Sequence, residues 1–128
     1  MKQPVDLARA YLKLADRDIK ALDLLSRSLE IDDETVGFHA QQAVEKCLKA
    51  VLALSSIPFR KTHDLQELMD LLIDNNKTLP PNAEKLDALN PYAVLLRYDF
   101  IDLKGVDRTA ARELVLSVRA WAEKQIAS

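Results

Sequence analysis

Apolar residues recur at spacings of three and four along most of the chain, which is the pattern of helices that bury one face. The first such segment predicts a helix over about 5–29. Its expected inner face consists of Leu7, Tyr11, Leu14, Ala15, Ile19, Leu22, Leu25 and Leu29. The acidic run that follows supplies Asp32 and Asp33 as N-cap candidates, because a carboxylate there accepts hydrogen bonds from unpaired backbone N–H groups. A second helix is therefore predicted over about 34–56, and Gly37 should weaken its first turn by about 1 kcal/mol relative to alanine.

Proline and capping residues divide the next part of the chain. Pro58 ends the second helical pattern. Thr62 as N-cap, with Asp64 in the first turn, predicts a third helix over about 63–76. The Pro-Pro pair after it predicts a loop that carries one or two helical turns.

Two further helix starts follow that loop. Asn90 and Pro91 form the pairing expected of an N-cap and a first helical residue, so a helix is predicted to open there. Asp107 is expected to cap the last helix. Its apolar stripe consists of Ala111, Leu114, Val115, Val118, Trp121, Ala122 and Ile126.

These elements predict an all-α fold in a single domain over residues 1–128. Four main helices plus one or two short ones, joined by connections mostly under a dozen residues, favour an up-and-down bundle with sequential helices antiparallel. The composition agrees, because the chain has only two glycines and 5% aromatic residues.

Charge and cysteine content exclude several classes of protein. The formal net charge is -2, from 18 basic and 20 acidic residues, so no global field attracts nucleic acid. Cys47 is the single cysteine and only two histidines are present, so no disulfide, zinc site or cofactor is expected. The N-terminal residues carry charges throughout and the longest apolar run is 50–54. We therefore expect a cytoplasmic protein without a secretory signal or membrane span.

The stretch "NPYAVLLRYDF" holds the first candidate binding residues. The guanidinium of Arg97 could donate two hydrogen bonds to a phosphate, and Tyr98 beside it could stack on a base, with Asp99 completing the group. The alternative is structural: Arg97 pairs with Asp99 or Asp102 and Tyr98 fills the core. The sequence leaves both interpretations open.

A second set of candidates lies on the second predicted helix. His39, Gln42, Lys46 and Lys49 follow one another at i, i+3, i+7 and i+10, which places them in one stripe. This stripe could line a polar groove or a dimer seam, or it could be a solvated edge. His63, beside the expected cap of the third helix, is better suited to anchoring the loop than to proton transfer. Nucleophile motifs, glycine-rich phosphate loops and the HExxH motif are absent from the sequence.

Three segments, "FHAQQAVEKCLKAVL", "KTHDLQELMDLL" and "LNPYAVLLRYDF", in this order and spacing, resemble the HEPN domain (higher eukaryotes and prokaryotes nucleotide-binding). The resemblance extends over about 5–125. It implies a helical bundle, commonly a homodimer, often made beside a minimal nucleotidyltransferase in a toxin-antitoxin pair. It also implies a cleft for a nucleotide or RNA around the "RY" sequence.

Active HEPN ribonucleases carry an arginine followed after four to six residues by histidine. Arg97 matches the arginine, but Asp102, Leu103 and Lys104 occupy the three possible histidine positions. Histidine is the side chain suited to proton transfer near neutral pH, so its absence there argues against cleavage at this site. No catalytic residue is therefore assigned.

The leading hypothesis is a noncatalytic homodimer that binds a nucleotide or the nucleotidyltransferase partner through Arg97, Tyr98 and Asp99. The secondary candidates are His39, Lys46 and His63. One alternative is a ribonuclease toxin in which Arg97 meets a histidine from elsewhere in the dimer. Another is a structural partner domain without a ligand.

Overall fold

The computed structural model describes residues 3–94 and 106–127, and the regular structure within these ranges is helical throughout. In chain order the elements are α1 (Pro4–Leu25), α2 (Asp33–Leu54), α3 (Leu65–Asp74), the 3₁₀ helix η1 (Ala83–Val94) and α4 (Arg108–Ala127). The predicted all-α bundle is confirmed.

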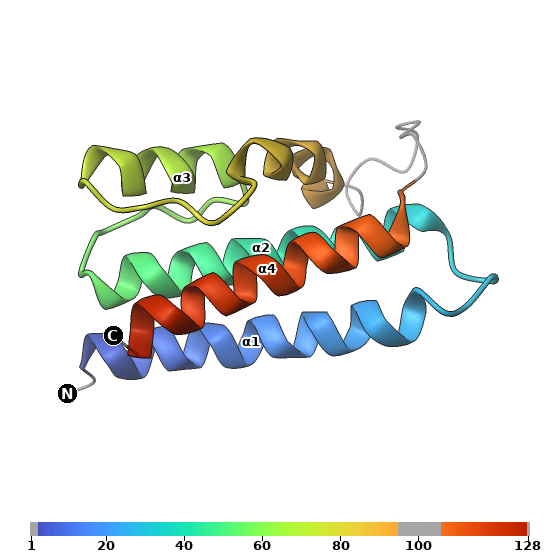
Figure 1. Cartoon of the computed structure of the whole chain (residues 1–128), viewed down its shortest axis with the longest axis horizontal. Helices are drawn as coiled ribbons and strands as arrows, with labels where there is room; N and C mark the ends of the chain where they lie inside the picture. The colour runs from blue at the N-terminus through green and yellow to red at the C-terminus, as the bar shows by residue number, and fades with distance from the viewer. Residues whose placement is uncertain (1–2, 95–105, 128) are drawn as a thin grey trace.

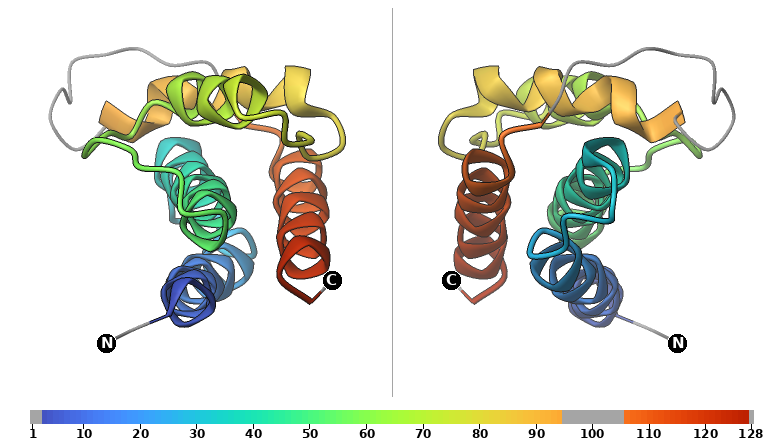
Figure 2. Two further views of the ribbon diagram at one scale, coloured as in Figure 1. Left: turned by 90° about the vertical axis from the view of Figure 1, so that its left-hand side faces the viewer. Right: turned by 90° about the vertical axis from the view of Figure 1, so that its right-hand side faces the viewer.

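Helix α2 is the central element of this bundle. It contacts α1, α3, η1 and α4, so it is enclosed on most of its circumference. Helix α1 runs antiparallel to α2, and α4 packs against both (Figure 1). Helix α3 and η1 form a layer over α2, while α1 lies at the opposite edge of the molecule (Figure 2).

Helix α3 runs in the same direction as α2, which differs from the alternation predicted for sequential helices (Figure 1). The segment 55–64 between them travels back along α2. Its Phe59 ring centre lies 5.8 Å from Lys49 Nζ, and the carbonyl oxygen of His63 accepts a hydrogen bond from Gln41 at 2.9 Å. Ten extended residues span up to about 33 Å, which is also about the length of a 22-residue helix. The connection is therefore long enough to return to the start of α2.

Helix α1 buries a face that overlaps the predicted one but is rotated from it: Ala15 and Leu22 are buried, and Tyr11, Ile19 and Leu25 pack against the core, as predicted. Its buried residues are Ala8, Leu12, Ala15, Asp18 and Leu22. Leu7 and Leu14, which were expected to face inward, remain 42% and 38% exposed. The helix also ends at Leu25, and Leu29 beyond it is fully exposed. Two apolar stripes coexist on this helix, so packing against α2 and α4, rather than periodicity, selects the inner one.

A single arginine terminates α1 and joins it to the starts of α2 and α4. The Arg108 guanidinium donates to four backbone carbonyl oxygens between residues 25 and 31, at 2.5–3.2 Å. Its Nε donates to Asp33 Oδ1 at 2.8 Å. The last carbonyl groups of a helix lack partners within that helix, so these bonds satisfy the end of α1 and hold the following turn.

Two of the predicted N-caps are confirmed. Asp32 accepts a hydrogen bond from the backbone N–H of Thr35 at 2.8 Å, and α2 begins at the next residue after the cap. Asp107 accepts from the N–H of Ala110 at 3.0 Å and caps α4.

The predictions for the start of α3 and for Asn90 are wrong. Asp64, rather than Thr62, caps α3 by accepting from the N–H of Gln66 at 3.0 Å. Asn90 lies inside η1 instead of opening a helix. Its amide donates to Asp64 Oδ1 at 2.9 Å and accepts from the N–H of Leu65 at 3.0 Å. Asn90 therefore caps a helix 25 residues away in the chain, a contact that no local pattern indicates.

Gly37 has a packing role that accounts for a glycine in the first turns of α2. A Cβ atom placed there would lie 2.7 Å from Cδ1 of the Tyr92 ring, closer than real contacts allow. Tyr92 is 7% exposed and closes η1 onto α2. The absence of a side chain at Gly37 thus lets η1 approach α2.

We expect Arg108→Ala to lower the free energy of unfolding by about 2–3 kcal/mol, because the substitution removes charge-assisted hydrogen bonds to Asp33 and to the end of α1. Chemical denaturation followed by circular dichroism measures this loss. The control is Arg112→Ala, at a second arginine of α4. It breaks a more exposed ion pair with Asp23 of α1 and should lower the free energy of unfolding by less. Equal losses for the two variants would contradict the assignment.

Asn90→Ala should raise the pKa of Asp64 toward its ordinary value. The hydrogen bond from Asn90 is the largest cause that holds this pKa down, ahead of the backbone N–H of Gln66. A lowered folded-state pKa means that Asp64 stabilises the fold above the unfolded-state pKa of about 4, and that this stabilisation is lost as pH falls through the folded-state value. Carboxyl carbon NMR titration measures the change, and Asn75→Ala, at the other end of α3, should leave the Asp64 pKa unaltered.

Candidate functional site

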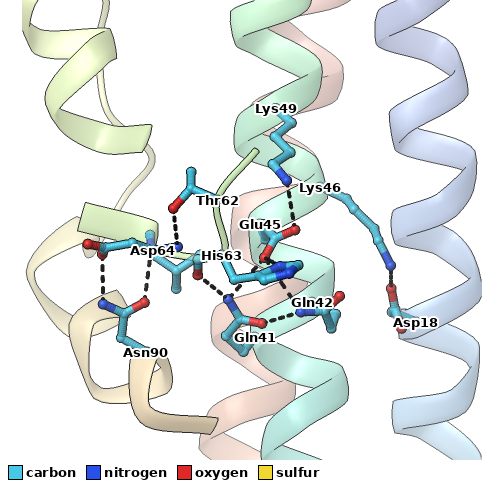
Figure 3. A network of polar contacts seen from close by, with 11 residues as sticks. Asp18, Gln41, Gln42, Glu45, Lys46, Lys49, Thr62, His63, Asp64 and Asn90 are labelled. Carbon is cyan, nitrogen blue, oxygen red and sulfur yellow. Dashed lines mark hydrogen bonds and ion pairs between the residues drawn. The ribbon is translucent and has the colours of Figure 1, made fainter. Parts of the chain in front are cut away.

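A buried carboxylate, Glu45, organises the polar side of α2 that faces the segment 55–64 (Figure 3). Its side chain is 3% exposed and lies 3.0 Å from Lys49 Nζ and 2.8 Å from His63 Nδ1. Gln42 donates to Gln41 Oε1 at 2.6 Å, and Gln41 donates in turn to the carbonyl oxygen of His63. Burial of a carboxylate is costly unless it is paired, so Glu45 requires these partners. His63 therefore anchors the loop to α2, the role that its sequence position favoured.

A second carboxylate, Asp18 on α1, forms a similar set on the neighbouring side of α2. Its Oδ1 lies 3.0 Å from His39 Nδ1, and its Oδ2 pairs with Lys46 Nζ. The Asp18 side chain is largely buried between α1 and α2. This set thus joins the two helices through side chains of opposite charge.

The two sets have the same composition. Each has one carboxylate that holds one lysine and the Nδ1 atom of one histidine. In each set the ammonium of the lysine balances the charge of the carboxylate. The two lysines are therefore already paired within the molecule.

The structure places three of the six predicted binding residues. His39 and Lys46 meet on Asp18, and His63 lies on Glu45. In the stripe of His39, Gln42, Lys46 and Lys49, carboxylates of α1 and α2 pair with the histidine and both lysines. Arg97, Tyr98 and Asp99 fall outside the described residues.

Sequence reasoning missed the two carboxylates that hold the stripe. Glu45 and Lys49 are spaced as an i,i+4 ion pair, which is the one local signal available for Glu45. Asp18 is 28 residues from Lys46 and 21 from His39, so only the packing of α1 on α2 brings them together.

A cavity of about 410 Å³ lies between η1 and α4. Leu89 and Tyr92 line it from η1, and Ala111 and Leu114 line it from α4. The charged residues Lys85, Asp107 and Glu113 also line it. Its volume is within the range of small-ligand pockets. None of the predicted binding residues that the structure describes lines this cavity.

Neither metal nor thiol chemistry is supported by the described residues. Within residues 3–94 and 106–127 no group of three or more metal-ligating side chains comes together. Burial raises the pKa of the Cys47 thiol to about 12, which suppresses its nucleophilic thiolate form.

Comparison with known proteins decides the family of this bundle. The sequence profile of the HEPN domain matches residues 8–124, which is nearly the whole chain. The chain belongs to the HEPN domain family. The HEPN fold expected from the three sequence segments is therefore established, and none of the helices described here is long and apolar enough to cross a membrane.

A curated relative adds a biological context. The chain is 35% identical over 57 residues to the protein named "Putative toxin MJ1304" from Methanocaldococcus jannaschii. The match covers 44% of this HEPN chain and 36% of the relative, so the chain spans about a third of that protein. No solved structure gives a significant match.

We expect Glu45→Ala to lower the free energy of unfolding by about 3–5 kcal/mol, because it leaves the ammonium of Lys49 buried without its carboxylate. Urea unfolding followed by the fluorescence of the single tryptophan, Trp121, measures the loss. Glu67→Ala is the matched control, since its ion pair with Arg60 is on the surface and should contribute little. A loss no larger than that of the control would show that Glu45 does not hold the loop.

Proposed function

We propose that this HEPN protein is a noncatalytic binding component of a toxin-antitoxin-type pair, and that it binds a nucleotide or its nucleotidyltransferase partner as a homodimer. The observation that carries the proposal is the sequence after Arg97, where Asp102, Leu103 and Lys104 occupy the positions of the ribonuclease histidine. A carboxylate of ordinary pKa, about 4, is a weak base, and a lysine of ordinary pKa, about 10, would need a large decrease in pKa to accept a proton near neutral pH.

The placement of the two histidines supports the proposal. His39 on α2 is held by Asp18 of α1, and His63, in the segment before α3, is held by Glu45 of α2. Each imidazole thus has a structural partner that accounts for its position. Neither histidine follows Arg97 at the ribonuclease spacing.

In the proposed complex Arg97 binds a phosphate through its planar fork, and Tyr98 stacks on the base. Asp99 completes this group. His39, Lys46 and His63 are secondary contacts, because carboxylates of the same molecule already hold their polar atoms. The context of a toxin pair comes from the HEPN family and from the name of the M. jannaschii relative.

Isothermal titration with ATP, GTP and a dinucleotide tests this function. We expect heat with at least one nucleotide and an affinity that falls about ten- to hundredfold in Arg97→Ala, since hydrogen bonds to charged groups contribute about 1.5–3 kcal/mol. Arg60→Ala is the control, because Glu67 already holds that guanidinium. An absence of heat, or equal affinities for wild type and Arg97→Ala, would overturn the nucleotide site.

A second candidate function is favoured by the geometry of His63. Its side chain is 45% exposed, while Nδ1 is fixed by the buried Glu45. A carboxylate that orients an imidazole through Nδ1 is a recurring arrangement for general bases. Under this alternative, His63 or His39 meets Arg97 across a dimer and the protein is a ribonuclease toxin. Cleavage of RNA by purified protein, abolished by both Arg97→Ala and His63→Ala, would favour it over the noncatalytic function.

A further inference from the structure

The outer face of α1 carries a second apolar stripe, which the described fold leaves partly exposed. Leu7, Leu14 and Leu24 are 42%, 38% and 60% exposed. Together with Ala10, Arg17 and Ala21 they follow one another at spacings of three and four, so they lie on one line of the helix, which is apolar except at Arg17. The line is about 26 Å long at the helical rise of 1.5 Å per residue.

Helix α1, which carries this stripe, lies at the edge of the molecule farthest from α3 and η1 (Figure 2). The buried side of α1 is occupied by α2 and α4. An exposed apolar line of this length is typical of a surface that meets another helix, because side chains at such spacing fit between those of a partner helix.

Basic residues run along the same face. Lys13, Arg17 and Lys20 are exposed, and their spacing of four and three places them on one side of α1, with Arg17 inside the apolar line. No ion pair or side-chain hydrogen bond joins any of them to another residue within 3–94 and 106–127.

On the opposite side of α1, charged residues do have partners within the protein. There α1 is joined to α4 by ion pairs of Arg9 with Glu123, Asp16 with Arg119 and Asp23 with Arg112. The charged residues on the α4 side are thus neutralised across a helix interface, whereas the cations on the outer face are not.

These observations select the chemistry of the partner. A second copy of the same face would bring two sets of Lys13, Arg17 and Lys20 together, and like charges across an interface are costly. A lipid surface would have to accommodate Arg17 in the middle of the apolar line. RNA would find cations, but it would leave Leu7, Leu14 and Leu24 without apolar partners. A helix with leucine-like residues at the same spacing and carboxylates beside them satisfies both parts of the face.

We propose that the outer face of α1 is the docking surface for an acidic amphipathic helix of another protein. Leu7, Leu14 and Leu24 pack between the apolar side chains of that helix, and Lys13, Arg17 and Lys20 pair with its carboxylates. This inference deepens the partner-binding part of the proposed function, and it does not involve Arg97 or nucleotide binding.

The test uses the full chain and two synthetic peptides of about three heptads that carry leucine at the a and d positions. One peptide has glutamate at the flanking positions and the other has glutamine. We expect fluorescence anisotropy to show the glutamate peptide binding at least about tenfold tighter, with a preference that weakens as salt is added. Amide NMR shifts should map to residues 7–24.

Charge reversal provides the decisive comparison. The triple variant Lys13→Glu, Arg17→Glu, Lys20→Glu should lose the preference for the glutamate peptide. The matched control Lys61→Glu, Lys77→Glu, Lys124→Glu, which reverses three exposed lysines elsewhere and changes the net charge equally, should retain it. Leu14→Gln should weaken both peptides. Circular dichroism verifies that each variant is folded.

Several outcomes would overturn the proposal. They are no binding of the glutamate peptide, equal loss in the triple variant and its control, and shifts outside α1. Sedimentation that shows a wild-type dimer dissociated by Leu14→Gln would assign the face to a second copy. Competition by single-stranded RNA, with no peptide preference, would assign it to nucleic acid. Nucleotide titration of the same triple variant tests the Arg97 site separately, because the charge reversals on α1 should leave nucleotide binding unchanged.

Discussion

Helix α2 touches every other described helix, so each of its side chains must either pack or find a polar partner. Small residues meet the first requirement. Gly37 admits the Tyr92 ring, and Ala40 and Ala43 are fully buried. Glu45 shows the second requirement, because a carboxylate in this position is tolerated only with Lys49 and His63 against it. The other helices therefore pack where they cover the apolar side chains of α2 or supply partners for its polar ones.

The same constraint shapes the chemistry available to the protein. The two histidines and two of the lysines that could have met a ligand on this side of the molecule already pair with Asp18 and Glu45. They hold the loop before α3 and the α1 interface in place. The proposed binding of an external anion therefore falls mainly to cations elsewhere in the chain. On the outer face of α1, the described structure leaves such cations without internal partners, next to exposed leucines.

The ends of the helices are held by contacts of long range. Arg108 closes the end of α1 from the start of α4, and Asn90 reaches from η1 to the first turn of α3. Both side chains join segments that are distant in sequence and meet at one end of α2. Asn90 fixes the end of the segment between α2 and α3 through Asp64 and Leu65. The adjacent His63 joins the same segment to Gln41 and Glu45 on α2.

The sequence by itself determined the all-α class, the approximate extent of α1, α2, α3 and α4, and the caps Asp32 and Asp107, because periodicity and capping act within a few residues. It also identified the HEPN family from three segments, and the profile match confirms this. Only the tertiary structure decided which stripe of α1 is buried, that α3 runs parallel to α2, and that Asn90 caps α3. It alone placed His39 and Lys46 on Asp18. The physical reason is that each of these features depends on atoms brought together from distant parts of the chain, which local spacing does not encode.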